Sequence, residues 1–167
     1  LVGINTVRRD NPQLTTRLVK GKDPLKVIVD SKLKDQITGK IMKDPSRVII
    51  ATTSRAHKKS IENLKKRGVR VVITKPDRGL VNMKELMRNL GSMGIMNLLI
   101  EGGAKINSSV LKDNLVDKML IFTAPKIIGK GKASIGNLGI TKVDKAINLK
   151  NSKITSIGKD VLVEGYL

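Results

Sequence analysis

The chain has no cysteine and no tryptophan, and its single histidine is His57. The absence of cysteine excludes disulfides, thiolate metal sites and cysteine nucleophiles among these residues. One histidine gives no basis for a histidine metal cluster, so we expect no metal site. Chemistry must therefore come from carboxylates, hydroxyls, amines or a bound cofactor, and the sequence by itself identifies no catalytic residue.

Long hydrophobic runs are also missing. The chain contains no stretch of about 18 apolar residues, which is the length that a membrane-spanning helix needs. Its first residues, from Leu1 to Asn5, lack the basic region of a signal peptide. We therefore expect a cytoplasmic protein with no membrane partner.

What the chain does have is ordinary size and a large positive charge. Its 167 residues, of which 40% are hydrophobic, suffice for one domain with a normal core. The net charge is +19, because 33 Lys and Arg face 14 Asp and Glu, and such a field attracts polyanions without specificity. Only Phe122 and Tyr166 could stack on bases, which argues against a single-strand binder.

The densest basic stretch, residues 55–67, places its apolar side chains at helical spacing on one face. This spacing favours a solvated amphipathic helix over a nucleic-acid surface.

Two periodicities alternate along the chain. Short β-branched runs predict strands, and polar-apolar segments between them predict helices. The predicted strands are Leu25–Val29, Val48–Ala51, Val69–Ile73, Leu98–Ile100 and Met119–Thr123, and the predicted helices run from an N-cap at Ser54 to Gly68, from Asn82 to Leu90 and from Ala104 to Asp113. Strands that alternate with helices pair in parallel through right-handed crossovers, so we predict an α/β fold with a mostly parallel central sheet and helices on both faces. Beyond Pro125, residues 147–157 and 161–166 predict two antiparallel strands at the edge, joined by the turn 158–160.

The most informative stretch runs from Leu98 to Ala104. An apolar run ends at Glu101, Gly102 and Gly103, and helical spacing then resumes. A strand, a glycine turn and a helix start can hold a phosphate, because free N–H groups and the helix dipole favour an anion. The same turn is often only a connection between elements.

Other predicted strand ends carry hydroxyls and lysines that suit a ligand with more than one phosphate. These are residues 30–34, Thr52 to Ser54, and the segment from Asn5 to Arg17. Each hydroxyl alone could serve only as a turn or helix cap. No G-x-G-x-x-G occurs, and residues 129–132 (GKGK) lack the rest of a phosphate-binding P-loop.

Several motifs, taken in order, resemble one family. They are VGINTV at 2–7, DNPQLT at 10–15 with Arg17, VDS at 29–31, EGGA at 101–104, LVD at 115–117 and APKIIG at 124–129. Over nearly the whole chain these resemble the reductase of riboflavin biosynthesis, and most of all the stand-alone archaeal and fungal type. The bacterial type is fused to a zinc deaminase, and the absence of cysteine excludes that module from this chain.

The resemblance implies a fold like dihydrofolate reductase, NADPH as cofactor, a phosphorylated pyrimidinone substrate and a homodimer. The reaction that it implies is reduction of the ribosyl group of 2,5-diamino-6-ribosylamino-4(3H)-pyrimidinone 5′-phosphate to the ribitylamino form.

The resemblance also implies site residues. Arg17 would bind the substrate phosphate, with Leu14 and Glu101 also against the substrate. Cofactor contacts would come from Thr6, Asp10, Ser31, Lys32, Lys34, Gly102, Gly103, Ala104, Lys105, Ile106 and Asn107. A guanidinium suits two-point capture of a phosphate, which agrees with the role of Arg17.

Three departures from the family pattern stand out. The chain is expected to be a single reductase domain that lacks the family's N-terminal strand-turn-helix segment. Residues 129–136 replace a more regular glycine-rich and acidic stretch beside the nicotinamide, and residues 107–109 lack an aromatic that often follows the asparagine. Two alternatives stay open: another NADPH-dependent reductase of the same fold, or a basic nucleic-acid-associated protein without catalysis.

Overall fold

The computed structural model describes residues 1–167 and is built around a parallel sheet. Its strands are β1 (Val2–Gly3), β2 (Lys26–Val29), β3 (Val48–Thr53) and β4 (Arg70–Thr74), in the order β1-β2-β3-β4, and every pair is parallel. All residues of β3 are buried, as expected for a central strand that is covered on both faces. The strands predicted for β2, β3 and β4 are confirmed.

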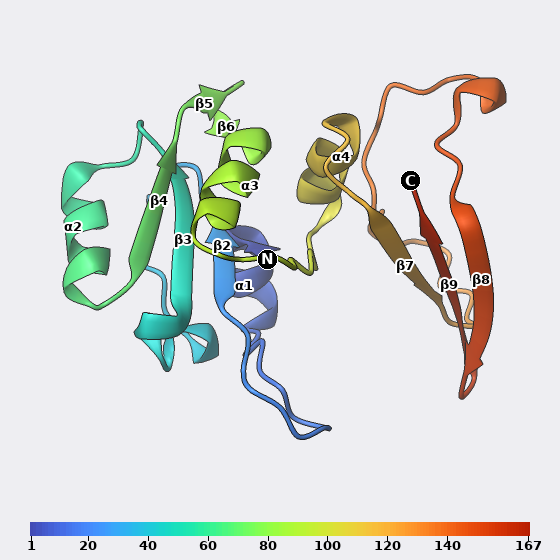
Figure 1. Cartoon of the computed structure of the whole chain (residues 1–167), viewed down its shortest axis with the longest axis horizontal. Coiled ribbons are helices and arrows are strands. Elements are labelled where there is room, and N and C mark those ends of the chain that lie inside the picture. The colour runs from blue at the N-terminus through green and yellow to red at the C-terminus, as the bar shows by residue number, and fades with distance from the viewer.

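Helices cover both faces of this sheet (Figure 1). On one face, α1 (Ile4–Asp10) and α2 (Lys58–Lys66) pack on a core that includes Ile28 and Ile50. On the other face, α3 (Met83–Ser92) and α4 (Ala104–Lys112) pack on Val27, Ile49 and Ala51. Successive residues of a strand point to opposite faces, so one apolar run supplies both cores.

The ends of α2 show one confirmed and one wrong boundary. The helix ends before Gly68, whose φ of +81° is the left-handed conformation that glycine favours. It begins at Lys58 and not at Ser54, because residues 53–56 form a separate turn. In that turn the N–H of Ala56 bonds to the carbonyl of Thr53, and the N–H of Arg55 bonds to Thr53 Oγ1.

The predicted strand Leu98–Ile100 is not a regular strand. The segment lies beside Leu1 and makes only two backbone contacts: the Leu1 amino group donates to the Leu99 carbonyl (2.5 Å), and the Glu101 N–H donates to the Leu1 carbonyl (2.9 Å). This is the pattern of one parallel pair. The segment therefore extends the sheet next to β1, but it is paired only with Leu1.

Several short elements were not predicted from the sequence. These are α1, the hairpin of β5 (Pro76–Asp77) with β6 (Leu80–Val81), and the 3₁₀ turns η1 (Lys40–Met42), η2 (Pro45–Arg47) and η3 (Val143–Lys145).

The last third of the chain forms a second sheet of three antiparallel strands. Its strands are β7 (Lys118–Thr123), β8 (Lys150–Ile157) and β9 (Asp160–Tyr166), in the order β7-β9-β8. The predicted hairpin is present, but it pairs with β7 in a sheet of its own. Figure 1 shows α4 between the two sheets, with β7 as the nearer edge strand. None of the helices has the length and apolar character needed to cross a bilayer.

Candidate functional site

The carboxyl ends of the parallel strands meet along one edge, which we call the carboxyl edge. The Leu98–Glu101 segment runs parallel to β1, so its glycine turn arrives at this same edge. The chain order also reverses there, because β1 to β4 follow one direction and the next segment returns to the far side of β1. Open α/β sheets bind ligands at such a switch point.

The start of α4 offers free hydrogen-bond donors at this point. Gly103 is its N-cap, and no side chain caps the helix. The N–H groups of Ile106 and Asn107 bond to the Gly103 carbonyl, whereas those of Ala104 and Lys105 have no backbone acceptor. Free donors at the positive end of a helix favour an anion.

The two glycines of the turn have different reasons to be glycine. A Cβ on Gly102 would lie 2.8 Å from Asn107 Oδ1 and 2.9 Å from the Ile106 side chain. A Cβ on Gly103 would meet nothing within 4 Å. Gly102 is therefore needed for packing against α4, and the space beside Gly103 is open to a ligand.

Side chains of α4 anchor a distant loop over this turn. The Asn107 Nδ2 amide donates to the carbonyls of Gly102 (3.0 Å) and Ser134 (2.8 Å), and the Gly136 N–H donates to Ser108 Oγ (2.7 Å). The loop 129–136 is thereby fixed against the first turns of α4. Sequence reasoning missed this contact, because no local pattern links residues 27 positions apart.

Ser31 lies at the carboxyl edge, after β2. Asp30 Oδ1 accepts the N–H groups of Lys32 and Leu33, both at 3.1 Å, and folds a tight turn there. The Ser31 carbonyl accepts from Thr53 Oγ1 (2.8 Å), and its hydroxyl accepts from the Val81 N–H (3.1 Å). Ser31 thus joins the ends of β2 and β3 to β6.

Lys32 and Lys34 are both exposed, and neither takes part in an ion pair. Lys34 also lines a groove of about 250 Å³ between the segment 33–37 and α2. Two free ammonium groups beside Ser31 keep this strand end positively charged.

Helix α1 leads away from the carboxyl edge. Thr6 is half-buried near its start, and Asp10 is its last, exposed residue. With seven residues, the helix is about 10 Å long. Thr6 is thus on the side of the glycine turn, whereas Asp10 is at the far end of the helix.

Leu14 and Arg17 lie beyond α1, in the loop between α1 and β2. Leu14 has a φ of +50° and packs against the core, while Arg17 is exposed. The base of the loop is closed by two bonds, from the Thr16 N–H to Asp23 Oδ1 (2.9 Å) and from Thr16 Oγ1 to the Lys22 carbonyl (3.2 Å). Arg17 thus lies in the loop that follows the far end of α1, seven residues beyond Asp10.

Glu101 is exposed directly before the glycine turn. The Glu101 N–H donates to the Leu1 carbonyl (2.9 Å), which places Glu101 beside the start of β1, at the switch point. Burial lowers the pKa of the Leu1 amino group, and the Glu101 carboxylate acts in the opposite direction.

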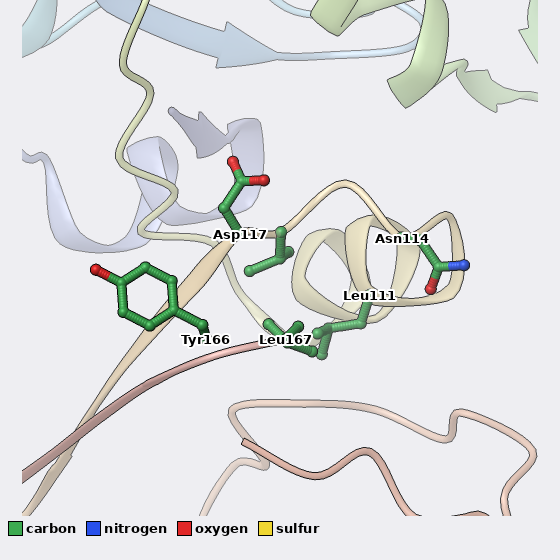
Figure 2. Close-up of a pocket in the computed structure, with 6 residues that line it drawn as sticks. Leu111, Asn114, Asp117, Tyr166 and Leu167 are labelled. Carbon is green, nitrogen blue, oxygen red and sulfur yellow. The ribbon is translucent and has the colours of Figure 1, made fainter. Parts of the chain in front are cut away.

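A larger hollow, of about 420 Å³, lies at the other end of α4 (Figure 2). Its lining consists of Leu111, Asn114, Val116, Asp117, Tyr166 and Leu167. It carries one carboxylate and no cationic side chain, so it is unsuited to a phosphate.

Comparison with known proteins gives a consistent match. Residues 1–163 match the family described as the RibD C-terminal domain. The chain is 35% identical over 164 residues to the riboflavin biosynthesis protein RibD of Aquifex aeolicus, covering 98% of this chain and 44% of that protein. The chain thus spans less than half the length of the RibD relatives that it matches.

A shorter relative is covered more fully. The 2,5-diamino-6-ribosylamino-4(3H)-pyrimidinone 5′-phosphate reductase of Aquifex aeolicus is 32% identical over 167 residues, covering 98% of this chain and 74% of that protein. Among solved structures, Acinetobacter baumannii RibD superposes with a TM-score of 0.82 at 24% identity, covering 99% of this chain and 45% of that one. At that identity the superposition supports the fold alone.

Proposed function

The chain belongs to the RibD C-terminal domain family, and we propose on this basis that it is a reductase of riboflavin biosynthesis. Its proposed substrate is 2,5-diamino-6-ribosylamino-4(3H)-pyrimidinone 5′-phosphate, the compound for which the shorter Aquifex relative is named. The observation that carries the proposal is the uncapped start of α4 at the switch point of the sheet.

The cofactor in this proposal is NADPH. The N–H groups of Ala104 and Lys105, beside the open space at Gly103, would donate hydrogen bonds to its pyrophosphate. Ser31, Lys32 and Lys34 serve the adenosine end. When bound, the nicotinamide supplies a hydride to C1 of the ribosylamino group, the bond from C1 to the ring oxygen breaks, and that oxygen takes up a proton.

The residues proposed for the cofactor site would have different tasks. Gly102, Ile106 and Asn107 build the turn, since Ile106 packs against Gly102 and Asn107 bonds to its carbonyl. Thr6 lies near the start of α1 and Asp10 at its end, so the two contact different parts of the bound ligands. These contacts stay predictions.

The substrate end of the proposal uses Glu101, Leu14 and Arg17. Glu101 stands at the switch point, where hydride transfer takes place. Arg17 has no ion-pair partner, so its guanidinium is free to grip a phosphate through two parallel bonds. A substrate that reaches from Glu101 to Arg17 lies along α1.

We propose further that the chain is one reductase domain completed by the family's N-terminal strand-turn-helix segment. Two unpaired edges support this. The N–H and C=O groups of Leu98 and Ile100 have no backbone partner although both residues are half-buried, and β7 pairs on one side only. One added strand between them would satisfy both edges. The expected homodimer stays a prediction.

A cofactor titration tests the proposed function. We expect NADPH fluorescence to change on binding, with a dissociation constant lower than that for NADH. A chain that binds neither cofactor, with or without the completing segment, would favour the nucleic-acid alternative.

A further inference from the structure

Arg55 is an exposed cation that the proposed cofactor site has not used. It follows Ser54 at the end of β3, on the carboxyl edge and beside the turn after β2 that carries Ser31 and Lys32. Nothing in the family resemblance gives Arg55 a role.

A short chain of hydrogen bonds fixes the backbone of Arg55 relative to Ser31. The Arg55 N–H donates to Thr53 Oγ1 (3.2 Å), and Thr53 Oγ1 donates to the Ser31 carbonyl (2.8 Å). Thr53 is fully buried. These bonds fix the backbone position from which the Arg55 side chain extends, next to the strand end that carries Ser31.

The Arg55 guanidinium lies against the tip of the β5–β6 hairpin. Its Nη1 atom is 3.5 Å from where a Cβ on Gly79 would stand, and Gly79 has a φ of +80°. The same hairpin is bonded to Ser31, through the N–H of Val81. Ser31, Arg55 and the hairpin therefore form one connected structure.

The nearest acids do not neutralise this cation. Arg55 takes part in no ion pair. The Asp30 carboxylate is buried, with its Oδ1 accepting backbone N–H groups, and Glu85 Oε2 accepts the N–H of Lys75. Neither these two carboxylates nor that of Asp77 in the hairpin forms an ion pair with Arg55.

We propose that Arg55 binds the 2′-phosphate of the adenosine half of the cofactor and is a determinant of the preference for NADPH over NADH. The inference rests on the proposed function. Arg55 and Ser31 follow neighbouring parallel strands at the carboxyl edge and contact the same hairpin. A planar guanidinium is suited to a phosphate monoester, which it can meet with two parallel N–H bonds.

The test uses fragments of the cofactor, because these need only the adenosine end of the site. Calorimetry on the 167-residue chain compares adenosine 2′,5′-bisphosphate with adenosine 5′-monophosphate, which lacks the 2′-phosphate. The parent should bind the bisphosphate more tightly. Arg55→Ala should weaken binding of the bisphosphate by about tenfold, or about 1.4 kcal/mol, and leave the monophosphate unchanged. Arg55→Lys should fall between the two.

Arg70→Ala is the matched control. Arg70 is an exposed arginine at the start of β4, on the opposite edge of the sheet, and its loss removes the same charge. This variant should bind the bisphosphate like the parent. Lys34→Ala, placed in the groove beside α2, separates that lysine from Arg55 in the same assay.

The outcomes are distinct. Equal losses in Arg55→Ala and Arg70→Ala, or no loss in either, overturn the role of Arg55 and leave the reductase proposal intact. A parent that does not distinguish the two fragments overturns both this inference and the choice of NADPH. Thermal unfolding at the parental temperature in Arg55→Ala confirms that a loss of binding is not a loss of fold.

Discussion

Gly102 and Gly103 are neighbours whose substitution should affect different properties, stability at Gly102 and cofactor binding at Gly103. A side chain on Gly103 meets no protein atom, and its φ of −76° is open to any residue. We therefore expect Gly103→Val to unfold at nearly the parental temperature. Because the new side chain fills the space proposed for the pyrophosphate, NADPH binding should weaken about tenfold or more, about 1.4 kcal/mol.

Gly102→Ala provides the contrast. Its Cβ would clash with Ile106 and Asn107, so it should lower the unfolding temperature, since overpacking costs about 1 to 3 kcal/mol. Fluorescence titration and thermal unfolding of both variants separate the two effects. Unchanged NADPH binding in Gly103→Val would make the turn a structural connection only.

Arg17→Lys keeps the positive charge and removes the planar fork. If Arg17 grips the substrate phosphate through two bonds, the KM for the pyrimidinone phosphate should rise about tenfold and NADPH affinity should stay unchanged. The measurement belongs at about 0.15 M salt, where surface attraction is screened over about 8 Å.

Arg88→Lys, on the exposed face of α3, is the control for the same chemical change elsewhere. A KM for Arg17→Lys that equals that of Arg88→Lys would make Arg17 one surface charge among many.

For single residues, the sequence predicts local motifs better than it predicts hydrogen bonds between residues that are far apart in the chain. The glycine turn and the lysines after Ser31 could be found from local pattern. The two bonds of Asn107 could not, because Ser134 reaches it only through the folded path of the chain. Arg55 was predicted as part of a solvated helix, and it lies instead in the turn before α2.

Among the elements, α3 begins where its sequence predicts, because Asn82 Oδ1 accepts the N–H of Glu85 at 3.0 Å. Asn82→Ala removes this cap and should lower the free energy of unfolding by about 1 kcal/mol. Asn82→Ser keeps an acceptor and should retain most of the stability. Urea unfolding measures both, and equal losses would show that the cap contributes nothing.

The strands fall into two groups by how well they could be predicted. β2 and β3 are short apolar runs that are almost wholly buried, and β4 is a similar run at the sheet edge, with Arg70 and Ile73 exposed. A short apolar run between turn signals can be recognised as a strand from the sequence. Leu98–Ile100 has the same composition but is not a regular strand, because hydrogen bonding to a neighbour decides the element and its neighbour is a single residue. Helix α1 was missed because its seven residues carry one buried apolar side chain, Val7.

At the scale of the whole molecule, the α/β class could be predicted from the alternation of strands and helices, but the division into two sheets could not. The sequence pattern after Pro125 predicted antiparallel strands added to the edge of the parallel sheet. Whether the antiparallel strands join the parallel sheet depends on whether another strand lies between the two. Such pairing depends on which strands are neighbours, and local sequence pattern does not show it.

This division yields a prediction about the domain. In an extended form, with a family-type strand-turn-helix segment before Leu1, the amides of Leu98 and Ile100 and those of the outer edge of β7 should become protected from hydrogen exchange. The amides of β3, already paired on both sides, should not change. Exchange measured by mass spectrometry on both forms tests this, and unchanged exchange at both edges would contradict the proposed completion.

The proposed reductase reduces a ribosylamino group with NADPH. The most direct measurement incubates the extended form with NADPH and 2,5-diamino-6-ribosylamino-4(3H)-pyrimidinone 5′-phosphate, and follows both the oxidation of NADPH and the mass of the product. We expect substrate-dependent oxidation of NADPH, with one ribitylamino product, heavier by two hydrogen atoms, formed per cofactor oxidised. A protein that binds NADPH but leaves this substrate unchanged would contradict the proposed activity and favour another reductase of the same fold.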